Sequence, residues 1–578
     1  LLLFCCFLCE EKRLLFLAVL AVVTALQPSK RKTIRNIAAN LPNKKTTSEL
    51  TEYFLSGKLI KSGLIVSFMT LVSRVLGLVR DVVIANFLGT GVAADIFFFA
   101  NKIPNFLRRL FAEGAFAQAF VPVLSEYHVK DTEQNPQSLE NTRRLIAQVS
   151  GTLGVLVSIV TLIGVIASPL LVALFGFGWF IDWVVDGPNK HKFELASELL
   201  KITFPYLWFI SLTALAGAVL NTLGKFAVAA FTPVLLNVVI ITMAIVGQDW
   251  FETSGHVLAW GVFVGGLVQF LFQIPFLIKA GVMTKPKWAW RAKGVSRIRQ
   301  LIIPALFGVS VTQINLLLDT LIASFLMTSS ISWLYYADRL LEFPLGLFGI
   351  GIATVILPSL SRLHAKDNRQ DFAQTLDWGT RIVSLFGWPA LAGLVALAQP
   401  IIMVLFMRGE FSTNDVQQVS FALYAYLSGL MSFMYIKIFA PGYYARQDTK
   451  TPVNIAIKAM IANMAFNLML APFLGYIGLA LATALSATLN ASLLYLGLKK
   501  LGVFSFSRST LLFLAKVLFS SGVMFTVVLW YSPSFEVWVE YSFMAKVAEL
   551  TIAILLGAIT YFLSVVILGV RMRDLKAH

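Results

Sequence analysis

Charged side chains lie inside stretches of this sequence that are otherwise apolar enough to cross a lipid bilayer. One stretch contains SRVLGLVRD at residues 73–81, which places Arg74 and Asp81 seven positions apart, on one face of a helix. Arg80 points about 100° away from Asp81 on that helix. A charge at the middle of a bilayer costs about 2.5–3.5 kcal/mol, so we expect these side chains to face a polar cavity and to have a function.

A polar stripe follows in the next apolar stretch, NKIPNFLRRLFAEGAFAQAF at residues 101–120. Pro104 and Gly114 allow this helix to bend or unwind, which frees backbone groups toward a cavity. The stripe consists of side chains at spacings of three and four, with Arg108 beside it: Lys102, Asn105, Arg109 and Glu113. A later stretch, YADRLLEFP at residues 336–344, places three charges within one turn: Asp338, Arg339 and Glu342.

The charges of the first two stretches are mostly positive. The basic residues are Arg74, Arg80, Lys102, Arg108 and Arg109, and the acidic residues are Asp81, Asp95 and Glu113. Ion pairs that only lock helices together, which is the alternative interpretation, would need no surplus of one sign. An anionic ligand would need one, and the guanidinium group matches phosphate oxygens in a bidentate geometry. We therefore predict a phosphate-binding cavity, with Arg339 among its ligands.

A second polar cluster consists of oxygen-bearing side chains in later stretches. Its members are one carboxylate, two amides one helical turn apart and one hydroxyl: Asp319, Asn463, Asn467 and Thr483. Oxygen donors suit a hard cation such as Na⁺. The alternative is hydrogen-bonded packing between helices, and the presence of a single carboxylate favours that alternative.

The elements that hold these residues are predicted to be membrane-spanning helices. The chain of 578 residues is 58% hydrophobic and only 13% charged, with a mean hydropathy of +0.78, whereas soluble proteins are about one quarter charged. The apolar runs are about 20 residues long and apolar all round, which excludes a barrel and indicates helices. We predict fourteen spans: 62–88, 92–124, 145–174, 198–221, 228–247, 256–278, 301–326, 331–360, 375–405, 417–443, 452–471, 475–498, 509–531 and 546–570.

The charges of the loops predict the orientation of these spans. Loops on one side hold 22 lysines and arginines and loops on the other side hold three, Lys190, Lys192 and Arg408. Basic loops stay in the cytoplasm, so both termini are expected there. The net charge of +17 is explained in this way, and no basic soluble domain is present to bind nucleic acid.

An internal repeat indicates two similar halves. Residues 167–180 (ASPLLVALFGFGWF) and 398–411 (AQPIIMVLFMRGEF) share six identities at an offset of 231, and Asp81 and Asp319 match at an offset of 238. The repeat predicts an all-α membrane protein with an N-lobe at 57–290, a C-lobe at 291–500 and a substrate site between them. The last two spans, within 501–578, lie outside the repeat.

The first 56 residues are excluded from the predicted fold. They hold all three cysteines, Cys5, Cys6 and Cys9, so thiolate chemistry is excluded from the rest of the chain. The apolar run at 14–26 follows Lys12 and Arg13 and resembles the core of a signal peptide. We favour the alternative that this extension is upstream sequence outside the functional protein.

Several long blocks resemble the MurJ/MviN family of the multidrug/oligosaccharidyl-lipid/polysaccharide exporter superfamily. They are SRVLGLVRD (73–81), ADIFFFANKIPNFLRRLFAEGAFAQAFVPVLSEY (94–127), KITFPY (201–206), FGVSVTQ (307–313), SWLYYADRLLEFPLG (332–346) and APGYYARQDTKTPV (440–453). The resemblance covers residues 58–578. It implies a flippase that moves lipid II, the undecaprenyl-pyrophosphate-linked precursor of peptidoglycan, to the periplasmic leaflet.

The resemblance also implies roles for particular residues. The family's functional cavity arginines match Arg74, Arg80, Arg108 and Arg339, and Asp95 matches an acidic residue that could pair with Arg80 in a periplasmic gate. A sodium site described for part of the family resembles the cluster around Asp319. The last two spans are implied to form a groove for the lipid tail. Lipid II and membrane lipids are the expected partners, and a monomer is expected. No cofactor is expected, with Na⁺ at the cluster around Asp319 as the alternative.

Two other classes of function were weighed. An exporter of drugs or of another polyprenyl-linked glycan is the alternative within the superfamily, but a basic cavity does not suit a cationic drug. A membrane enzyme is disfavoured because the sequence contains no HExxH, GxSxG, Walker A or CxxC motif. Without an ATP site, transport is expected to use the membrane potential or an ion gradient.

Overall fold

The computed structural model of the chain describes residues 57–109, 115–134 and 139–571. The extension at 1–56 and the stripe residue Glu113 lie outside the described residues. The chain divides into two compact units, Leu1–Val72 and Ser73–His578. The described part of the first unit is the beginning of one helix, Gly57–Leu88, which continues into the second unit.

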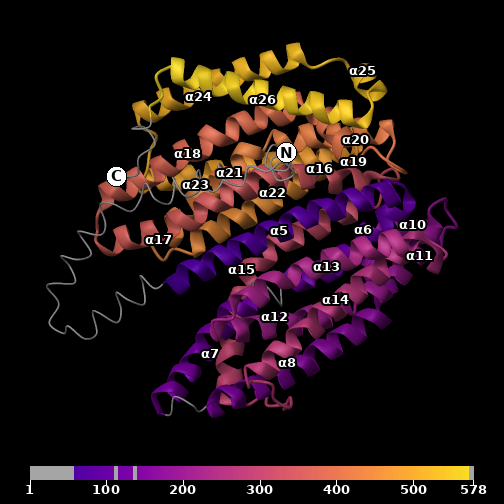
Figure 1. Cartoon of the computed structure of the whole chain (residues 1–578), viewed down its shortest axis with the longest axis vertical. Helices are drawn as coiled ribbons and strands as arrows, with labels where there is room; N and C mark the ends of the chain where they lie inside the picture. Colours follow the sequence, from indigo (N-terminus) through magenta and orange to yellow (C-terminus); the bar gives the residue numbers. More distant parts are fainter. Residues whose placement is uncertain (1–56, 110–114, 135–138, 572–578) are drawn as a thin grey trace. The chain divides into compact units, whose positions relative to one another are not determined.

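The described residues form helices and loops, without a strand (Figure 1). The first repeat contains α5 (Gly57–Leu88), α6 (Val92–Arg108), α7 (Ala115–Gln134), α8 (Glu140–Ile166), α9 (Ser168–Phe175), α10 (Phe177–Val184), α11 (Lys190–Thr203), α12 (Tyr206–Thr222), α13 (Phe226–Val246), the short η2 (Gln248–Trp250) and α14 (Ser254–Lys279). The second contains α15 (Lys293–Ala323), α16 (Ser330–Pro344), the π-helical η3 (Leu345–Ile350), α17 (Gly351–Ala365), α18 (Arg369–Ala396), α19 (Ala398–Phe406), α20 (Thr413–Leu427), α21 (Leu430–Tyr444), α22 (Lys450–Leu474) and α23 (Tyr476–Lys500). The chain continues through α24 (Arg508–Tyr531), α25 (Phe535–Glu540) and α26 (Phe543–Ile567).

The predicted all-α membrane fold is confirmed. Among the described residues, eleven helices are long and apolar enough to cross a membrane, and each coincides with one of the predicted spans. The other three predicted spans coincide with α5, with α6 and α7 together, and with α15. Helices suit this environment because they satisfy their backbone hydrogen bonds internally.

The internal repeat appears in the structure as a break at matching positions. The chain leaves helical geometry at Ala167, between α8 and α9, and at Leu397, between α18 and α19. Each break precedes a proline, Pro169 or Pro400, which fits the first turn of a helix because it has no N–H to donate. Each long helix of the pair therefore continues into a short one at the same point of the repeat.

Helix α15 packs against both repeats, which the predicted boundary at 290/291 does not anticipate. Near its start, Val295 and Ile298 belong to a buried cluster with Phe120 of α7 and Val149 of α8. Further along the helix, Asp319 accepts a hydrogen bond from Asn467 of α22. One 31-residue helix thus connects the core of the first repeat to the second.

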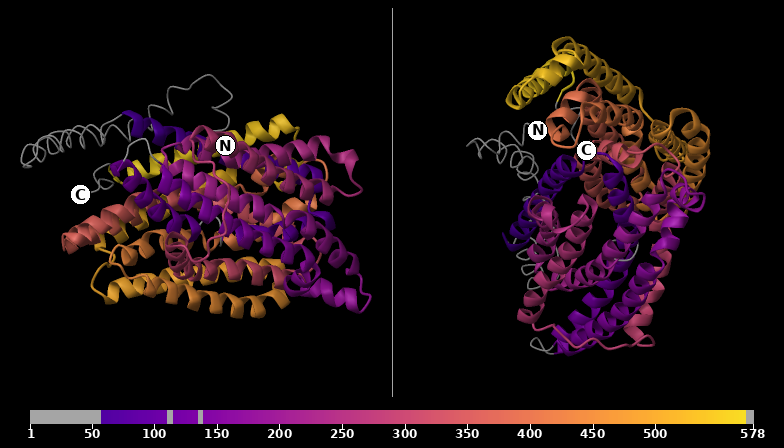
Figure 2. Two further views of the ribbon diagram at one scale, coloured as in Figure 1. Left: turned by 90° about the horizontal axis from the view of Figure 1, so that it is seen from below. Right: turned by 90° about the vertical axis from the view of Figure 1, so that its right-hand side faces the viewer.

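The last two long helices form a hairpin that packs on the second repeat. Helices α24 and α26 pack against each other, and α24 packs along α18 (Figure 1 and the right view of Figure 2). The joint to α18 is polar, because Arg381 pairs with Asp377 at 2.7 Å and donates to Thr510 of α24 at 2.9 Å. The Arg381 guanidinium also lies 5.7 Å from the ring centroid of Phe513.

A carboxylate outside the spans caps α8 from the preceding helix. The Asp131 oxygens accept four hydrogen bonds, from the backbone and side chain of both Asn141 and Thr142, at 2.7–3.2 Å. Burial alone would raise the pKa of the Asp131 carboxyl. The hydrogen bonds from Thr142 and Asn141 lower this pKa by more than burial raises it, so the pKa lies below its usual value. Asp131 thereby satisfies N–H groups that a helix start leaves without intrahelical partners.

Candidate functional site

A buried carboxylate connects arginines from the two repeats. Asp81, in the C-terminal half of α5, is 3% exposed. Its Oδ1 pairs with the Arg80 guanidinium at 2.7 Å, and its Oδ2 lies 3.3 Å from Nε of Arg339 on α16. The hydroxyl of Tyr335 also donates to Asp81, at 2.9 Å. One acidic group therefore balances a basic residue from each repeat.

The predicted pairing of Arg80 with Asp95 is wrong for this structure. Arg80 bonds to the neighbouring Asp81 although the two Cβ directions diverge, because the long arginine side chain bends back along the helix surface. Its other nitrogen donates to Asn237 of α13 at 3.1 Å, and Asn237 donates in turn to the Ser73 carbonyl at 3.2 Å. The amide of Asn237 thus holds Arg80 in place within the first repeat.

Arg339 is held by aromatic and acidic neighbours. It pairs with Glu342 at 2.9 Å, donates to the Tyr335 hydroxyl at 3.3 Å and lies 5.0 Å from that ring's centroid. The Tyr335 ring stacks on Phe98 of α6 at 3.8 Å, so it joins the two repeats. The Arg339 Nε is buried and has no hydrogen-bond partner among the described residues, because the contact with Asp81 is an ion pair without hydrogen-bond geometry.

Arg74 differs from the other two arginines because no described residue forms an ion pair with it. Its side chain is exposed, and its Nη1 lies only 2.4 Å from where a Cβ would stand on Gly346 of η3. Glycine at this position therefore makes room for the guanidinium. The π-helical turn of η3 follows Pro344, and such turns are often found at functional sites.

The predicted stripe on α6 is partly reproduced. Asn105 accepts a hydrogen bond from Arg108 at 3.1 Å, so this amide serves Arg108 and not the predicted neighbour Arg109. Lys102 and Arg109 are half-buried, and both act electrostatically on Asp338 of α16. Basic groups of α6 therefore face acidic groups of the second repeat.

Asp95 joins the repeats at the end of the molecule where α5 ends and α6 begins. Its carboxylate accepts from the backbone N–H of Ser329 at 2.7 Å and of Ser332 at 2.9 Å, and also from the Ser332 hydroxyl. These groups lie at the N-cap and in the first turn of α16, and Asp95 is 2% exposed. Asp95, predicted as a gate residue, thus bonds to a helix start and not to an arginine.

Further contacts close the same end. Lys192 of α11, which is 2% exposed, donates to the Thr328 hydroxyl at 2.7 Å. The Thr90 hydroxyl bonds to Asp415, which also caps the start of α20. The backbone N–H of Glu410 donates to the Asn86 carbonyl at 3.2 Å. Polar groups of the two repeats therefore form hydrogen bonds with each other at this end of the molecule.

The four predicted cation ligands lie together. Asn467 donates to Asp319 at 2.6 Å and to Asn463 at 2.9 Å, and Asn463 lies 3.5 Å from the Thr483 hydroxyl. Both asparagines are fully buried. The Asn467 Oδ1 is buried without a partner among the described residues, so this cluster has one acceptor to spare, as a cation site requires.

Several residues of the site escaped the sequence prediction: Asn237, Tyr335, Lys192, Ser329 and Ser332. Asn237 is the one amide in the apolar helix α13, and Lys192 is one of only three basic residues on its side, so both carried a detectable signal. Tyr335 and the serines carried none beyond the quoted block, because their role depends on partners more than 200 positions away.

Comparisons with known proteins agree with this architecture. The family model "Lipid II flippase MurJ" matches residues 84–549. A probable lipid II flippase MurJ of Vibrio cholerae is 60% identical over 91% of this chain and 99% of its own length, and one of Haemophilus influenzae is 59% identical over 88% and 99%.

Solved structures support the same assignment. "Lipid II flippase MurJ, inward closed conformation" superposes with a TM-score of 0.73 at 28% identity, covering 89% of this chain and 99% of that one. The inward-facing conformation of a multidrug resistance transporter, whose title places it in the MATE family of the MOP superfamily, has a TM-score of 0.58 at 14% identity, over 76% of this chain and 97% of that one, which is a likeness of fold alone. The chain is a member of the MurJ family of lipid II flippases, and hence a transporter and not an enzyme.

Proposed function

We propose that this protein moves lipid II from the cytoplasmic to the periplasmic leaflet of the bacterial inner membrane by alternating access of its two repeats. The observation that carries the proposal is Arg74, an exposed guanidinium inside a predicted span with no ion-pair partner among the described residues. The diphosphate of lipid II is a suitable partner, because a guanidinium binds phosphate oxygens in a bidentate geometry.

The network around Asp81 supports the same proposal. Asp81 holds Arg80 and Arg339 from the two repeats in the observed arrangement. A diphosphate that enters between the repeats would compete with this carboxylate for both guanidinium groups. Substrate binding would then release one contact between the repeats, which couples binding to their movement.

Substitution of the arginines tests the binding site. Arg74→Ala and Arg339→Ala are each expected to abolish complementation of cells depleted of their own flippase while leaving the protein in the membrane. Arg→Lys should rescue poorly, because an ammonium group loses the bidentate geometry. Arg369→Ala is the matched control, because that side chain is 92% exposed at the start of α18. Normal growth with Arg74→Ala and Arg339→Ala combined would refute the site.

The orientation is part of the proposal and follows from the loop charges. Both termini and the loop after α14 are assigned to the cytoplasm, and the end closed by Asp95 is assigned to the periplasm. Single cysteines at 250–255 should then react with an impermeant maleimide added outside the inner membrane, and cysteines at 285–293 should react only from the cytoplasm. The reverse pattern would contradict the assignment.

An ion gradient or the membrane potential is proposed to reset the carrier. One charge moved through 100 mV is worth about 2.3 kcal/mol, which is enough to bias two conformations. The cluster of Asp319, Asn463, Asn467 and Thr483 is the proposed cation site, supported by the unpartnered Asn467 Oδ1. Asp319 also lies within the electrostatic reach of Lys102 of the other repeat, so a cation there would replace a positive charge that moves away when the repeats separate.

Sodium-dependent stability tests the cation site directly. Sodium at millimolar concentration is expected to raise the melting temperature of the purified protein, measured against choline at equal ionic strength. Asp319→Asn should remove this effect and slow transport, while leaving lipid II binding largely intact. If sodium does not change the melting temperature of the unsubstituted protein, the cluster only packs helices together.

A further inference from the structure

A loop after α14 crosses the surface of α8 and is fastened to it. This strap, residues 281–292, donates from the Lys287 backbone to the Ala147 carbonyl at 2.8 Å and from the Ala289 backbone to the Thr152 hydroxyl at 3.2 Å. Gly151 permits the approach, because a Cβ there would stand 2.4 Å from the Lys287 backbone. The strap therefore has a defined position on the helix.

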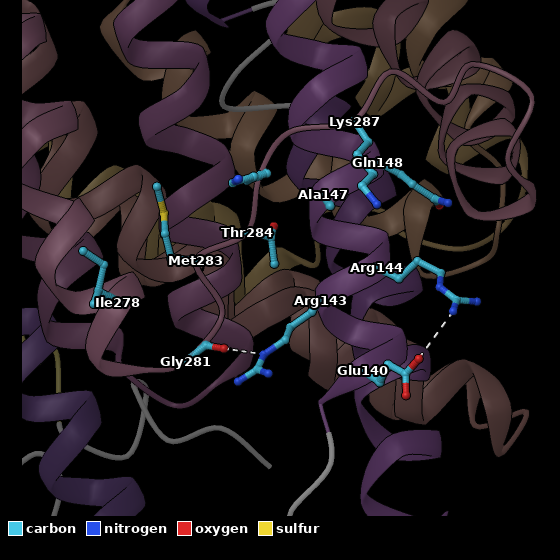
Figure 3. Close-up of a pocket in the computed structure, with 11 residues that line it drawn as sticks. Glu140, Arg143, Arg144, Ala147, Gln148, Ile278, Gly281, Met283, Thr284 and Lys287 are labelled. Carbon is cyan, nitrogen blue, oxygen red and sulfur yellow. Dashed lines mark hydrogen bonds and ion pairs between the residues drawn. The ribbon is translucent and has the colours of Figure 1, made fainter.

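The strap and the first turns of α8 enclose an open pocket of about 820 Å³ (Figure 3). Its charged lining consists of four basic side chains and one carboxylate, that of Glu140. The basic side chains come from both elements: Arg143 and Arg144 from α8, and Lys285 and Lys287 from the strap. With Glu140 subtracted, the pocket has a net charge of three positive units, and this favours an anion.

Some polar groups of the pocket already bond to the protein, and others remain available to a ligand. Arg143 donates through Nε to the Gly281 carbonyl (Figure 3), and its terminal nitrogens form no ion pair or hydrogen bond with the described residues. Arg144 reaches Glu140 at 3.4 Å, and both side chains are largely exposed, so this ion pair is weak. The Thr284 hydroxyl lines the pocket, is buried and has no hydrogen-bond partner among the described residues. A ligand with several acceptor oxygens would satisfy these donors.

Apolar side chains at the rim point to a ligand that is attached to a lipid. Ile278 and Met283 line the pocket and are 59% and 51% exposed. Beyond them the strap presents Trp288, 55% exposed, whose ring stacks against that of Trp290 at 6.1 Å. Exposed indole rings beside basic groups are typical of the interface between bilayer and water.

We propose that this pocket binds the phosphate group of an anionic phospholipid of the leaflet on the basic side, separately from the transported substrate. Basic pockets at the ends of membrane-spanning helices bind anionic head groups, while the acyl chains lie along apolar side chains. The apolar rim favours a lipid over free phosphate, which has the same oxygens but nothing to place on Ile278 or Met283. The leaflet is the cytoplasmic one in the orientation proposed above.

The experiment uses the full-length protein in nanodiscs of phosphatidylcholine with a rising fraction of phosphatidylglycerol. One of the two lipids carries brominated chains, and quenching of Trp288 is obtained as the difference between the protein and its Trp288→Phe variant. The ratio of quenching by the two lipids gives the preference for the anionic head group near the strap. A clear preference for phosphatidylglycerol is expected.

Two pairs of variants distinguish binding in a specific pocket from attraction by the overall surface charge. Arg144→Gln with Lys285→Gln should lower the preference about 30-fold, whereas Lys499→Gln with Lys500→Gln removes equal charge from the same side and should leave it unchanged. Gly151→Ala changes no charge but displaces the strap and should also lower the preference. Its control is Gly154→Ala, which meets nothing within 4 Å.

Three results would overturn the proposal. Equal loss in both charge variants would show that the basic side attracts anionic lipid without a specific pocket. An unchanged preference in Gly151→Ala, with the strap shown to be displaced by faster proteolysis, would show that the strap does not form the site. Displacement of the lipid by millimolar inorganic phosphate as effectively as by a soluble glycerophosphate head group would assign the pocket to free phosphate.

Discussion

The contact made by Asp95 predicts how strongly one side chain holds the repeats together. The substitution Asp95→Asn keeps the shape of the side chain but replaces one acceptor oxygen by an NH₂ group. The carboxylate now accepts from the backbone N–H of Ser329 and from two groups of Ser332. An amide has one oxygen, so it can serve Ser332 but turns a donor toward the Ser329 N–H.

The magnitude follows from the group left without a partner. A buried N–H that loses its acceptor costs about 1–3 kcal/mol. A middle value of about 2 kcal/mol corresponds to a shift of about 30-fold in the ratio of closed to open arrangements at this end. Because Asp95 bonds across the repeats, this cost falls on the closed arrangement and not on the fold of either repeat.

The assay measures how often this end opens. Ser330 is 1% exposed beside the contact, so a cysteine placed there in a protein lacking Cys5, Cys6 and Cys9 should react with an impermeant maleimide only after opening. Asp95→Asn is expected to raise the labelling rate about 30-fold, in line with the shift in population.

The control is Asp182→Asn, which removes a carboxylate that accepts from Asn189 at 2.7 Å within the first repeat. It should leave the labelling rate unchanged, because that hydrogen bond does not cross to the second repeat. Equal labelling of the Asp95→Asn variant and its parent would refute the reasoning.

Three further predictions follow from particular contacts. Gly346→Ala should reduce transport without lowering the melting temperature, since its Cβ displaces the Arg74 guanidinium, whereas Gly351→Ala, with nothing within 4 Å, should be neutral in a complementation assay. Asp131→Ala should lower the free energy of unfolding by about 1–2 kcal/mol, as loss of a helix cap does. Because the folded-state pKa of Asp131 is depressed, its contribution is present above the unfolded pKa of about 4 and is lost as pH falls through the folded value. The variant and its parent should therefore converge in denaturant titrations below about pH 4.

Much of the architecture follows from the sequence alone. Lipid cannot hydrogen-bond to a backbone, so apolar runs of sufficient length must be helices, and hydropathy locates them without knowledge of their neighbours. The repeat could also be detected from the sequence, because Pro169 and Pro400 mark the same break between a long helix and a short one, and this effect of proline does not depend on distant neighbours. The presence of functional charges was also evident, because a charge within an apolar run is costly and rare.

The partners of those charges were decided only by the tertiary structure. Arg80 is near enough in sequence to pair with Asp81 or with Asp95, and its long side chain can reach in several directions. The choice was made by Asn237, 157 positions away, which holds the guanidinium toward Asp81. Asp95 in turn found its donors in a loop 234 positions away, where backbone N–H groups at a helix start need an acceptor whatever the side chains are. A sequence pattern shows that a charged group is costly to bury. Which partner stabilises that group depends on how helices distant in the sequence pack against each other.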